Sequence, residues 1–250
     1  MAAPARRRAL SARGRPAIRE RVARRVRCAF LTLAAVAAAP AIAQTWDFEV
    51  RLDGKPIGTH RFVVDGPADA RTVSSTARFD VRLLGITVFR YRHEARERWR
   101  GDCLSEIRSS TDDDGRPVEV DRRLGPPAAA SAATATTTPI AGEPACLMSY
   151  AYWHPGLVQQ RRLLNPQTGD VDEISVERLP DATLPVGGRD VDAARWRITS
   201  VARALPAAEA SGKPSPARQV LTLWRDRADG RWIGLDAQVK GGRVLTYRLP

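Results

Sequence analysis

The sequence predicts an all-β protein, a single antiparallel meander of about ten strands that forms a curved sheet or half-barrel. Three observations support this prediction. Hydrophobic and polar residues alternate with a period of two along much of residues 44–250, which places successive side chains on opposite faces of a strand. Turns that contain glycine separate these runs at hairpin spacing. No long amphipathic helix is evident, and the best short helical candidate lies within residues 146–153.

Residues 1–43 have the composition of a signal peptide. Ten arginines and one glutamate precede an apolar stretch at residues 28–39, which is shorter than the roughly 20 residues that span a bilayer as a helix. The small residues Ala41 and Ala43 suit a signal peptidase, so we expect cleavage after Ala43. No cysteine stands at that site, which predicts a soluble periplasmic product and not a lipoprotein. The mature chain is then one β-rich domain over residues 44–250.

Most of the positive charge of the chain lies in this leader. The whole sequence carries a formal charge of +12, but residues 44–250 hold 30 basic and 27 acidic residues, a net charge of +3. A nucleic-acid-binding domain concentrates its basic residues in a patch or stripe. Here arginines are interleaved with acidic residues throughout, so we expect no nucleic-acid partner. After cleavage, no segment is expected to span the membrane.

Two cysteines remain after cleavage, Cys103 and Cys146. An even count in an oxidising compartment favours one disulfide, which would close a loop of 44 residues. Such a crosslink contributes roughly 3 to 4 kcal/mol to stability. Two buried free thiols are the alternative. A metal pair is less favoured because no CxxC spacing or His-Cys cluster accompanies the cysteines, and neither a metal nor a cofactor is expected.

The alternation predicts the first strands in chain order. Hydrophobic and charged residues alternate over residues 46–52, Asp53-Gly54 supplies a hairpin turn, and residues 57–64 return as the partner strand. The longest run covers residues 87–100, where charged side chains occupy one face and mostly apolar side chains the other. One solvated face and one apolar face are typical of an antiparallel sheet.

Further strands follow the same pattern, at residues 103–110, 117–124, 219–225, 233–239 and 244–249. Turns are expected at residues 111–115, 228–230 and 241–242. The first turn contains three consecutive aspartates before Gly115 but lacks the ligand spacing of a calcium loop, so we interpret it as a solvated hairpin turn. Residues 126–138 and 204–216 are rich in Ala, Pro, Ser and Thr and are expected to be mobile loops.

Several segments of the mature chain resemble a known family. They are Trp46–Gly58, Tyr152–Trp153 with Leu163–Gly169, Leu223–Asp226, Trp232–Leu235 and Leu245–Leu249. Over nearly the whole mature chain the sequence is similar to an uncharacterised domain-of-unknown-function family of exported bacterial proteins, of the 6134 type. It resembles more distantly a second uncharacterised periplasmic β-rich family with similar opening and closing hairpins. The resemblance implies a β-rich domain and brings no catalytic residues.

The first hypothesis for function is non-catalytic binding of a hydrophobic small molecule or lipid. A curved antiparallel sheet can enclose an apolar cavity. The mature chain has six tryptophans, several of them on apolar strand faces: Trp46, Trp99, Trp153, Trp196, Trp224 and Trp232. Such residues either line a ligand cavity or fill the core of the sheet, and the sequence leaves both readings open.

The second hypothesis is an enzyme built on histidine. Only His60, His93 and His154 can titrate near neutral pH, and the first two could meet across a sheet. Glu97 shares the strand face of His93, so a histidine pair with a carboxylate would form a general-base or transition-metal site. No pattern fixes the register that would join them, and the alternative is a buried core histidine. The serine-nucleophile and phosphate-loop signatures are absent.

The third hypothesis is an envelope protein-interaction module. Tyr152, Trp153 and His154 form an aromatic cluster that ends in a turn, shortly after Cys146. An exposed cluster would suit a partner protein, whereas a buried cluster would be a corner that packs into the core. The candidate ligand or partner contacts are therefore His60, His93, Trp99, Tyr152, Trp153 and His154. Non-catalytic binding is the favoured function.

Overall fold

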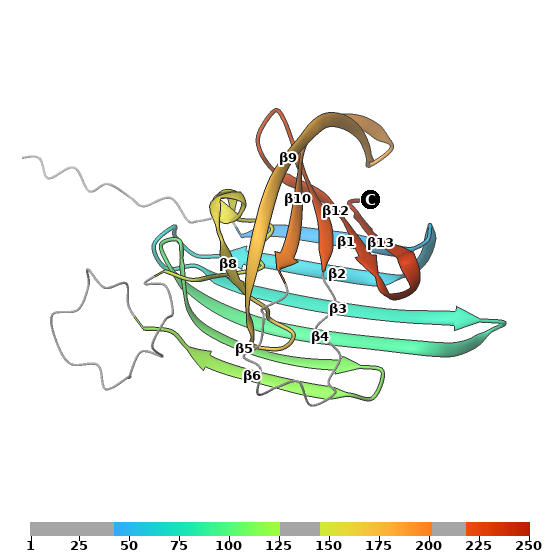
Figure 1. Cartoon of the computed structure of the whole chain (residues 1–250), viewed down its shortest axis with the longest axis horizontal. Coiled ribbons are helices and arrows are strands. Elements are labelled where there is room, and N and C mark those ends of the chain that lie inside the picture. Colours follow the sequence, from blue (N-terminus) through green and yellow to red (C-terminus); the bar gives the residue numbers. More distant parts are fainter. Residues whose placement is uncertain (1–42, 126–145, 202–218) are drawn as a thin grey trace, which may run out of the picture. The chain divides into compact units, whose positions relative to one another are not determined.

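The computed structural model describes residues 43–125, 146–201 and 219–250. These residues form one large, mostly antiparallel sheet (Figure 1). Its 13 strands lie in the order β6-β5-β4-β3-β2-β1-β13-β12-β11-β10-β9-β8-β7, and β7 pairs with β8 in parallel. The predicted all-β curved sheet is confirmed. The predicted signal peptide and the two predicted mobile loops lie outside the described residues.

The elements have these bounds: β1 Gln44–Leu52, β2 Lys55–Asp65, β3 Thr72–Leu83, β4 Ile86–Arg100, β5 Cys103–Asp113, β6 Pro117–Arg123, β7 Met148–Ser149, β8 Arg162–Leu164, β9 Val171–Val186, β10 Arg189–Val201, β11 Val220–Asp226, β12 Trp232–Val239 and β13 Arg243–Arg248. Two short 3₁₀ turns, η2 Pro155–Gln159 and η4 Lys240–Gly242, complete the described elements. The turns expected at Asp53-Gly54 and at residues 228–230 and 241–242 are present. The turn expected at residues 111–115 is confined to Asp114 and Gly115, because β5 continues to Asp113.

The sequence pattern does not predict β3 or the long β9–β10 hairpin. Along β9 only Ile174 and Leu184 are buried, so hydrophobic alternation is too weak there to mark a strand. The short helix expected within residues 146–153 is wrong, because that segment contains β7 and the helical turn η2 follows it. A proline at the start of η2 suits a helical first turn, where no amide hydrogen bond is lost. No helix in the described ranges has the length and apolar character needed to cross a membrane.

At the β7 end of the sheet, the residue before β7 is hydrogen-bonded to β5. The amide of Leu104 donates to the carbonyl of Leu147 over 2.9 Å. Immediately beside this contact, the sulfur atoms of Cys103 and Cys146 lie 2.09 Å apart, within bonding distance of a disulfide. The crosslink ties the start of β5 to the segment that leads into β7.

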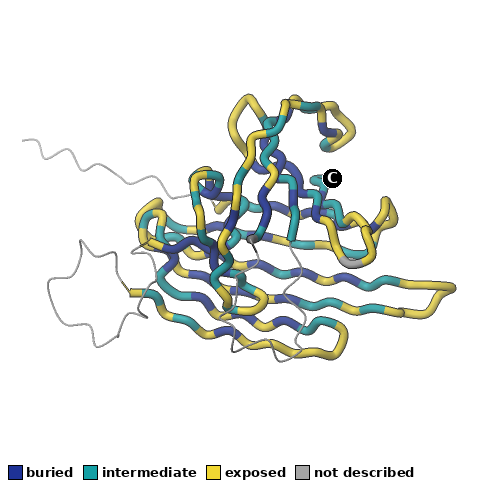
Figure 2. The backbone as a smooth tube through the Cα atoms, viewed as in Figure 1, coloured by how far each residue is buried: buried dark blue, intermediate teal, exposed yellow. Residues whose placement is uncertain are grey.

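Aromatic side chains pack densely against β1, β2 and β12. The ring centroid of Trp232 lies 4.4 Å from that of Phe48 and 5.0 Å from that of Phe62. The indole nitrogen of Trp46 donates to the carbonyl of Trp232 over 3.0 Å. All the tryptophans of the described residues except Trp196 are buried. Figure 2 shows the corresponding alternation of buried and exposed residues along the long strands. The buried tryptophans therefore contribute to core packing.

Candidate functional site

The sheet brings His60 and His93 together. Ala77 on β3 is the register partner of both His60 on β2 and His93 on β4, and the two ring centroids lie 6.4 Å apart. The Nε2 atom of His60 lies 2.7 Å from the Ser75 hydroxyl, and the Nδ1 atom of His93 lies 2.8 Å from the Thr111 hydroxyl. The register that the sequence left open is therefore the one that joins the two histidines.

Burial keeps both histidines neutral. Desolvation lowers the pKa of His93 to about 4. The pKa of His60 lies well below its usual value, first because of desolvation and then because of the neighbouring His93. Both rings bond to hydroxyl groups inside the sheet, and neither lines the cleft described below. We therefore assign this pair to a structural polar network.

Glu97 does not complete a site with the two histidines. It is buried four positions beyond His93 on β4, a separation of about 13 Å along a strand. Its Oε2 atom accepts a hydrogen bond from the Trp99 indole nitrogen over 2.8 Å. Desolvation raises the pKa of this carboxyl to about 7, against the lowering effect of the hydrogen bond from Trp99. In the part of the chain that the structure describes, no three His, Cys, Asp or Glu side chains are grouped to hold a metal ion.

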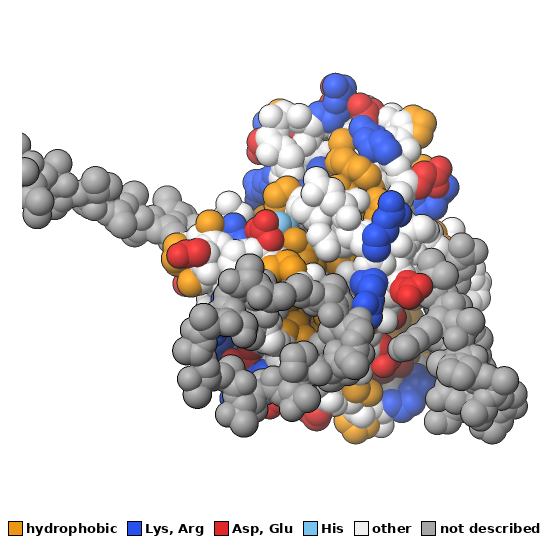
Figure 3. Space-filling model, turned by 60° about the vertical axis from the view of Figure 1, so that its left-hand side comes forward, with side chains coloured by type: hydrophobic (Ala, Val, Ile, Leu, Met, Phe, Trp, Pro, Cys, Tyr) orange, Lys and Arg blue, Asp and Glu red, His pale blue; other side chains and the backbone are white. Residues whose placement is uncertain are grey.

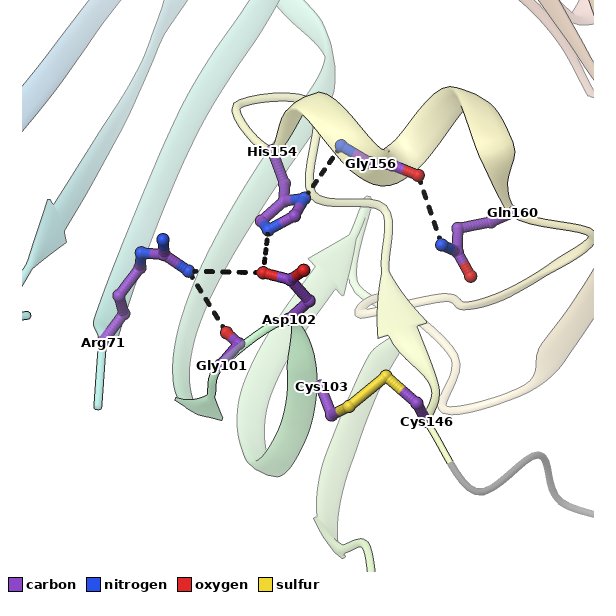
Figure 4. The surroundings of a disulfide bond; sticks show 8 residues. All are labelled: Arg71, Gly101, Asp102, Cys103, Cys146, His154, Gly156 and Gln160. Atoms are coloured by element: carbon purple, nitrogen blue, oxygen red, sulfur yellow. Dashed lines mark hydrogen bonds and ion pairs between the residues drawn. A yellow bond between two sulfur atoms is a disulfide. The ribbon is translucent and has the colours of Figure 1, made fainter. Parts of the chain in front are cut away.

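A second polar centre lies at the corner after β7, residues 152–156 (Figure 4). The amide of Gly156 donates to Nδ1 of His154 over 3.0 Å, so Nε2 carries the ring proton and donates to the Asp102 carboxylate over 3.0 Å. Arg71 lies 3.9 Å from the same carboxylate and donates to the Gly101 carbonyl over 3.1 Å. Both ring nitrogens of His154 are thus occupied. The ring positions the corner and leaves no free nitrogen for a general base.

The predicted aromatic cluster packs inward at this corner. Trp153 is only 9% exposed, and its ring centroid lies 5.3 Å from that of the buried Trp99. His154 stacks on Trp99 with 7° between the ring planes, and the half-buried Tyr152 contacts Trp232 with 5.4 Å between centroids. At Trp153 the structure therefore follows the buried alternative, a corner that packs into the core.

Arg225 on β11 holds the corner in place. Its side chain is 5% exposed, and Nη2 donates to the carbonyls of Tyr152 and His154 over 2.9 and 2.6 Å. Its Nε has no hydrogen-bond partner, and no carboxylate in the described ranges forms an ion pair with it. Desolvation lowers the pKa of the guanidinium to about 10, so the group stays charged at neutral pH.

A cleft of about 730 Å³ lies beside the corner, and Arg225 forms part of its lining. Its apolar lining comes from the corner, η2 and β10, namely Trp153, Pro155, Val158, Ala194 and Trp196. Its charged lining comes from β11 and the β11–β12 turn, namely Arg225, Asp226, Arg227, Asp229 and Arg231. Gln44 and Thr45 at the start of β1 complete it. The cleft therefore combines apolar surface with three arginines and two aspartates.

The alternation of side chains along β11 gives one sequence signal for this cleft. Arg225 lies on the strand face of Leu221 and Leu223, which are buried, so the pattern places a charge in an apolar core. Trp196 and Arg231 become neighbours of this charge only through the pairing of β10 with β11 and the turn into β12. No sequence pattern fixes those neighbours.

Arginines and acidic side chains are mixed on the face drawn in Figure 3, as the interleaved charges predict.

Comparison with known proteins places the chain in a family. A crystal structure described as a beta-barrel-like protein of domain of unknown function DUF1849 from Brucella abortus is similar, with a TM-score of 0.51 and 10% sequence identity. The similarity covers 85% of this chain and 98% of that chain, and at this identity it shows the fold alone. No curated protein matches the sequence. A family model described as a domain of unknown function matches residues 48–250, and the chain therefore belongs to the DUF6134 family.

Proposed function

We propose that this chain is an exported, non-catalytic binding protein for an amphiphilic anion, a molecule with a long apolar part and a carboxylate or phosphate head group. The ligand occupies the cleft beside the corner. The observation that carries the proposal is Arg225, a buried guanidinium that bonds to carbonyl groups and has no carboxylate counter-ion in the described ranges.

The electrostatics of Arg225 favour an anionic ligand. A buried charge is costly when no opposite charge lies beside it. The carbonyls of Tyr152 and His154 offset part of that cost. A ligand carboxylate or phosphate would add charge-assisted hydrogen bonds, which are stronger than those to neutral acceptors. The same lining also contains the exposed Arg227 and Arg231, so its three arginines outnumber its two aspartates, Asp226 and Asp229.

The apolar lining favours a ligand with a long hydrophobic part. Trp196 is the tryptophan that core packing leaves partly exposed, and it lines the cleft with Trp153, Pro155 and Val158. Small-molecule sites combine mostly apolar walls with a few placed polar groups. Hydrophobic contact in this proposal thus depends mainly on Trp196, because Trp153 also belongs to the core and is only 9% exposed.

The proposed location is the periplasm. The signal-peptide pattern of residues 1–43 supports export. A disulfide between Cys103 and Cys146 would persist in that oxidising compartment. It would also restrain the segment that leads to the corner and the cleft.

Titration with three related amphiphiles tests the proposal. Oleate, lysophosphatidic acid with the same acyl chain, and uncharged monoolein are added to the chain while tryptophan fluorescence is recorded. We expect saturable binding of both anions and roughly tenfold or more weaker binding of monoolein, because charge-assisted hydrogen bonds are lost. Equal affinity for all three compounds contradicts the charge argument. Absence of binding by either anion refutes the proposed function.

Matched variants locate the binding site. Arg231→Gln and Trp196→Ala alter the cleft while leaving the corner contacts of Arg225 intact, and each should weaken oleate binding by roughly fivefold or more. Arg243→Gln removes an exposed arginine that pairs with Asp53 at another turn, and it should leave the affinity unchanged. Equal weakening by Arg243→Gln and Arg231→Gln would show that overall charge, and not the cleft, attracts the ligand.

A further inference from the structure

The β3–β4 hairpin extends beyond the strands on either side of it (Figure 1). β2 pairs with β3 only as far as Phe79, and β5 pairs with β4 only as far as Tyr91. Residues 80–89 therefore form a two-stranded ribbon with no further described strand beside it. Arg90 at the base of the ribbon exchanges hydrogen bonds with Asp114 in the β5–β6 turn. An isolated two-stranded ribbon is marginally stable in water, so its composition needs an explanation.

The tip of this ribbon exposes large apolar side chains. The exposed fractions are 63% for Leu83, 95% for Leu84, 70% for Ile86 and 51% for Val88, and Figure 2 shows the tip as exposed. Contiguous apolar surface of this kind marks an interaction site.

The apolar tip is continuous with the buried face of the sheet. Phe79 pairs with Tyr91, Val81 with Phe89, and Leu83 with Ile86. Phe79, Val81 and Leu83 occupy alternate positions of β3 and so share one face, and directly paired residues of two strands lie on the same face. The three pairs therefore form one apolar strip, which continues across the register shift between Val81 and Arg82. The strip begins at the buried Phe79 and ends at the solvent-exposed tip.

The turn at the tip holds a residue that its backbone conformation disfavours. Three hairpins of the sheet have two-residue turns in which a residue other than glycine, followed by glycine, has positive φ: Asp53-Gly54, Leu84-Gly85 and Asp114-Gly115. The first residues have similar φ values of 49°, 51° and 56°. A short polar side chain tolerates this left-handed region, and leucine does not. The turn itself therefore does not require Leu84, and a contact made by its side chain explains its presence.

Positive charge lies on the ribbon behind the apolar tip. Residues 80–92 contain three arginines and one aspartate. Asp80 contacts Arg90 and Arg92 over 3.6 and 2.9 Å, while Arg82 is exposed and no ion pair joins it to an acid in the described ranges. Apolar side chains ahead of arginines match the boundary between acyl chains and anionic head groups of a bilayer.

We propose that the β3–β4 hairpin inserts its tip into a membrane surface that contains anionic phospholipid. Leu83, Leu84 and Ile86 enter the acyl boundary, and Arg82 and Arg90 meet the head-group phosphates. This surface is separate from the cleft, and the two proposals stand or fall independently.

Vesicle flotation tests the insertion. The protein is purified from its host, and intact mass spectrometry identifies its N-terminal residue. Wild type should float with vesicles of phosphatidylglycerol and phosphatidylethanolamine, and far less with phosphatidylcholine alone. Leu84→Asp installs the residue found at the same position of the other two turns, so the fold should tolerate it. It should weaken vesicle binding roughly tenfold or more, because the contact between the leucine side chain and the acyl chains is lost. Val118→Asp makes the same charge change at a partly exposed position on β6 and should bind like wild type.

Three results would overturn the membrane assignment. One is equal flotation of wild type and Leu84→Asp. Another is absence of wild-type binding to anionic vesicles. The third is a Leu84-dependent dimer in sedimentation velocity, which would show that a second copy covers the tip. The Arg231→Gln variant, which alters only the cleft, should float like wild type. The flotation experiment therefore gives its answer even if the cleft proposal fails.

Discussion

The molecule contains two buried polar centres that differ in how their charges are satisfied. At the first, His60 and His93 are neutral and bond to the hydroxyls of Ser75 and Thr111. At the second, Arg225 stays charged, bonds to backbone carbonyls and borders a cleft. Both contain titratable groups with shifted pKa values, yet only the second leaves a charge without a counter-ion in the described ranges. Burial of a titratable group is thus weaker evidence for a binding site than an uncompensated charge beside a cleft.

Removal of the disulfide should produce the largest difference in local stability between the two centres. In a Cys103→Ala, Cys146→Ala double variant, the free energy of unfolding should fall by roughly 4 kcal/mol, because the intervening loop is no longer closed in the unfolded chain. Urea denaturation of the variant and the oxidised wild type measures this change. Hydrogen exchange should then show a greater loss of protection at residues 152–156 than on β2 and β4. Equal loss at both places would contradict a local role for the crosslink.

Glu97→Gln should reveal the cost of the buried carboxyl that accepts a hydrogen bond from Trp99, beside the corner. The folded-state pKa of Glu97 is raised to about 7 from 4.5, so its stabilising contribution is complete below pH 4.5 and is lost as the pH rises to about 7. The stability of wild type relative to the glutamine variant should therefore fall by about 3 kcal/mol over that interval. Urea midpoints measured every half pH unit give this difference. A constant difference between the two proteins would show that Glu97 is ionised at all these pH values.

His93→Gln should give the opposite pH dependence. The folded-state pKa of His93 is lowered to about 4 from 6.5, so its stabilising contribution is complete above pH 6.5 and is lost as the pH falls to about 4. Relative to this variant, wild type should lose stability on acidification by about 3 kcal/mol, measured by the same urea midpoints. Because the two variants have opposite slopes, each is the control for the other. Slopes of the same sign would show that one of the two groups is charged when it should be neutral.

Asp102→Asn should have the smallest effect and should act on the corner alone. Burial lowers the pKa of His154, and the Asp102 carboxylate opposes that shift. The variant should lower the His154 pKa further, which an NMR titration of the ring protons measures. Stability should change by less than about 1 kcal/mol, because Asp102 is mostly exposed and the asparagine oxygen still accepts a hydrogen bond from Nε2 of His154. An unchanged His154 titration would mean that the contact is absent in solution.

Hairpins with strong local signals were predictable. Asp53-Gly54 lies between two alternating runs, and the structure pairs Leu52 with Lys55 around that turn. The alternation at residues 87–100 corresponds to β4. The β9–β10 hairpin was missed because its side chains do not alternate clearly between buried and exposed positions. Hydrophobic alternation in the sequence therefore predicted the strands that have one solvent-exposed face and one buried face.

The candidate cleft was not predictable in the same way. Arg225 could be noticed as a charge on an apolar face, but its carbonyl partners at Tyr152 and His154 lie more than 70 positions away in sequence. The pairing of His60 with His93 likewise depends on both strands meeting Ala77. Each of these contacts is set by strand register and not by nearby residues.

The sequence by itself determined the all-β class, the main hairpin turns and the family, because these follow from short-range alternation, turn chemistry and similarity along the chain. Only the tertiary structure decided that most tryptophans fill the core, that His154 is held by Asp102 and Gly156, and that Arg225 borders a cleft. It also showed that the β3–β4 tip extends beyond its neighbours. The physical reason is that burial, counter-ions and exposure depend on which distant strands pair, and in what register.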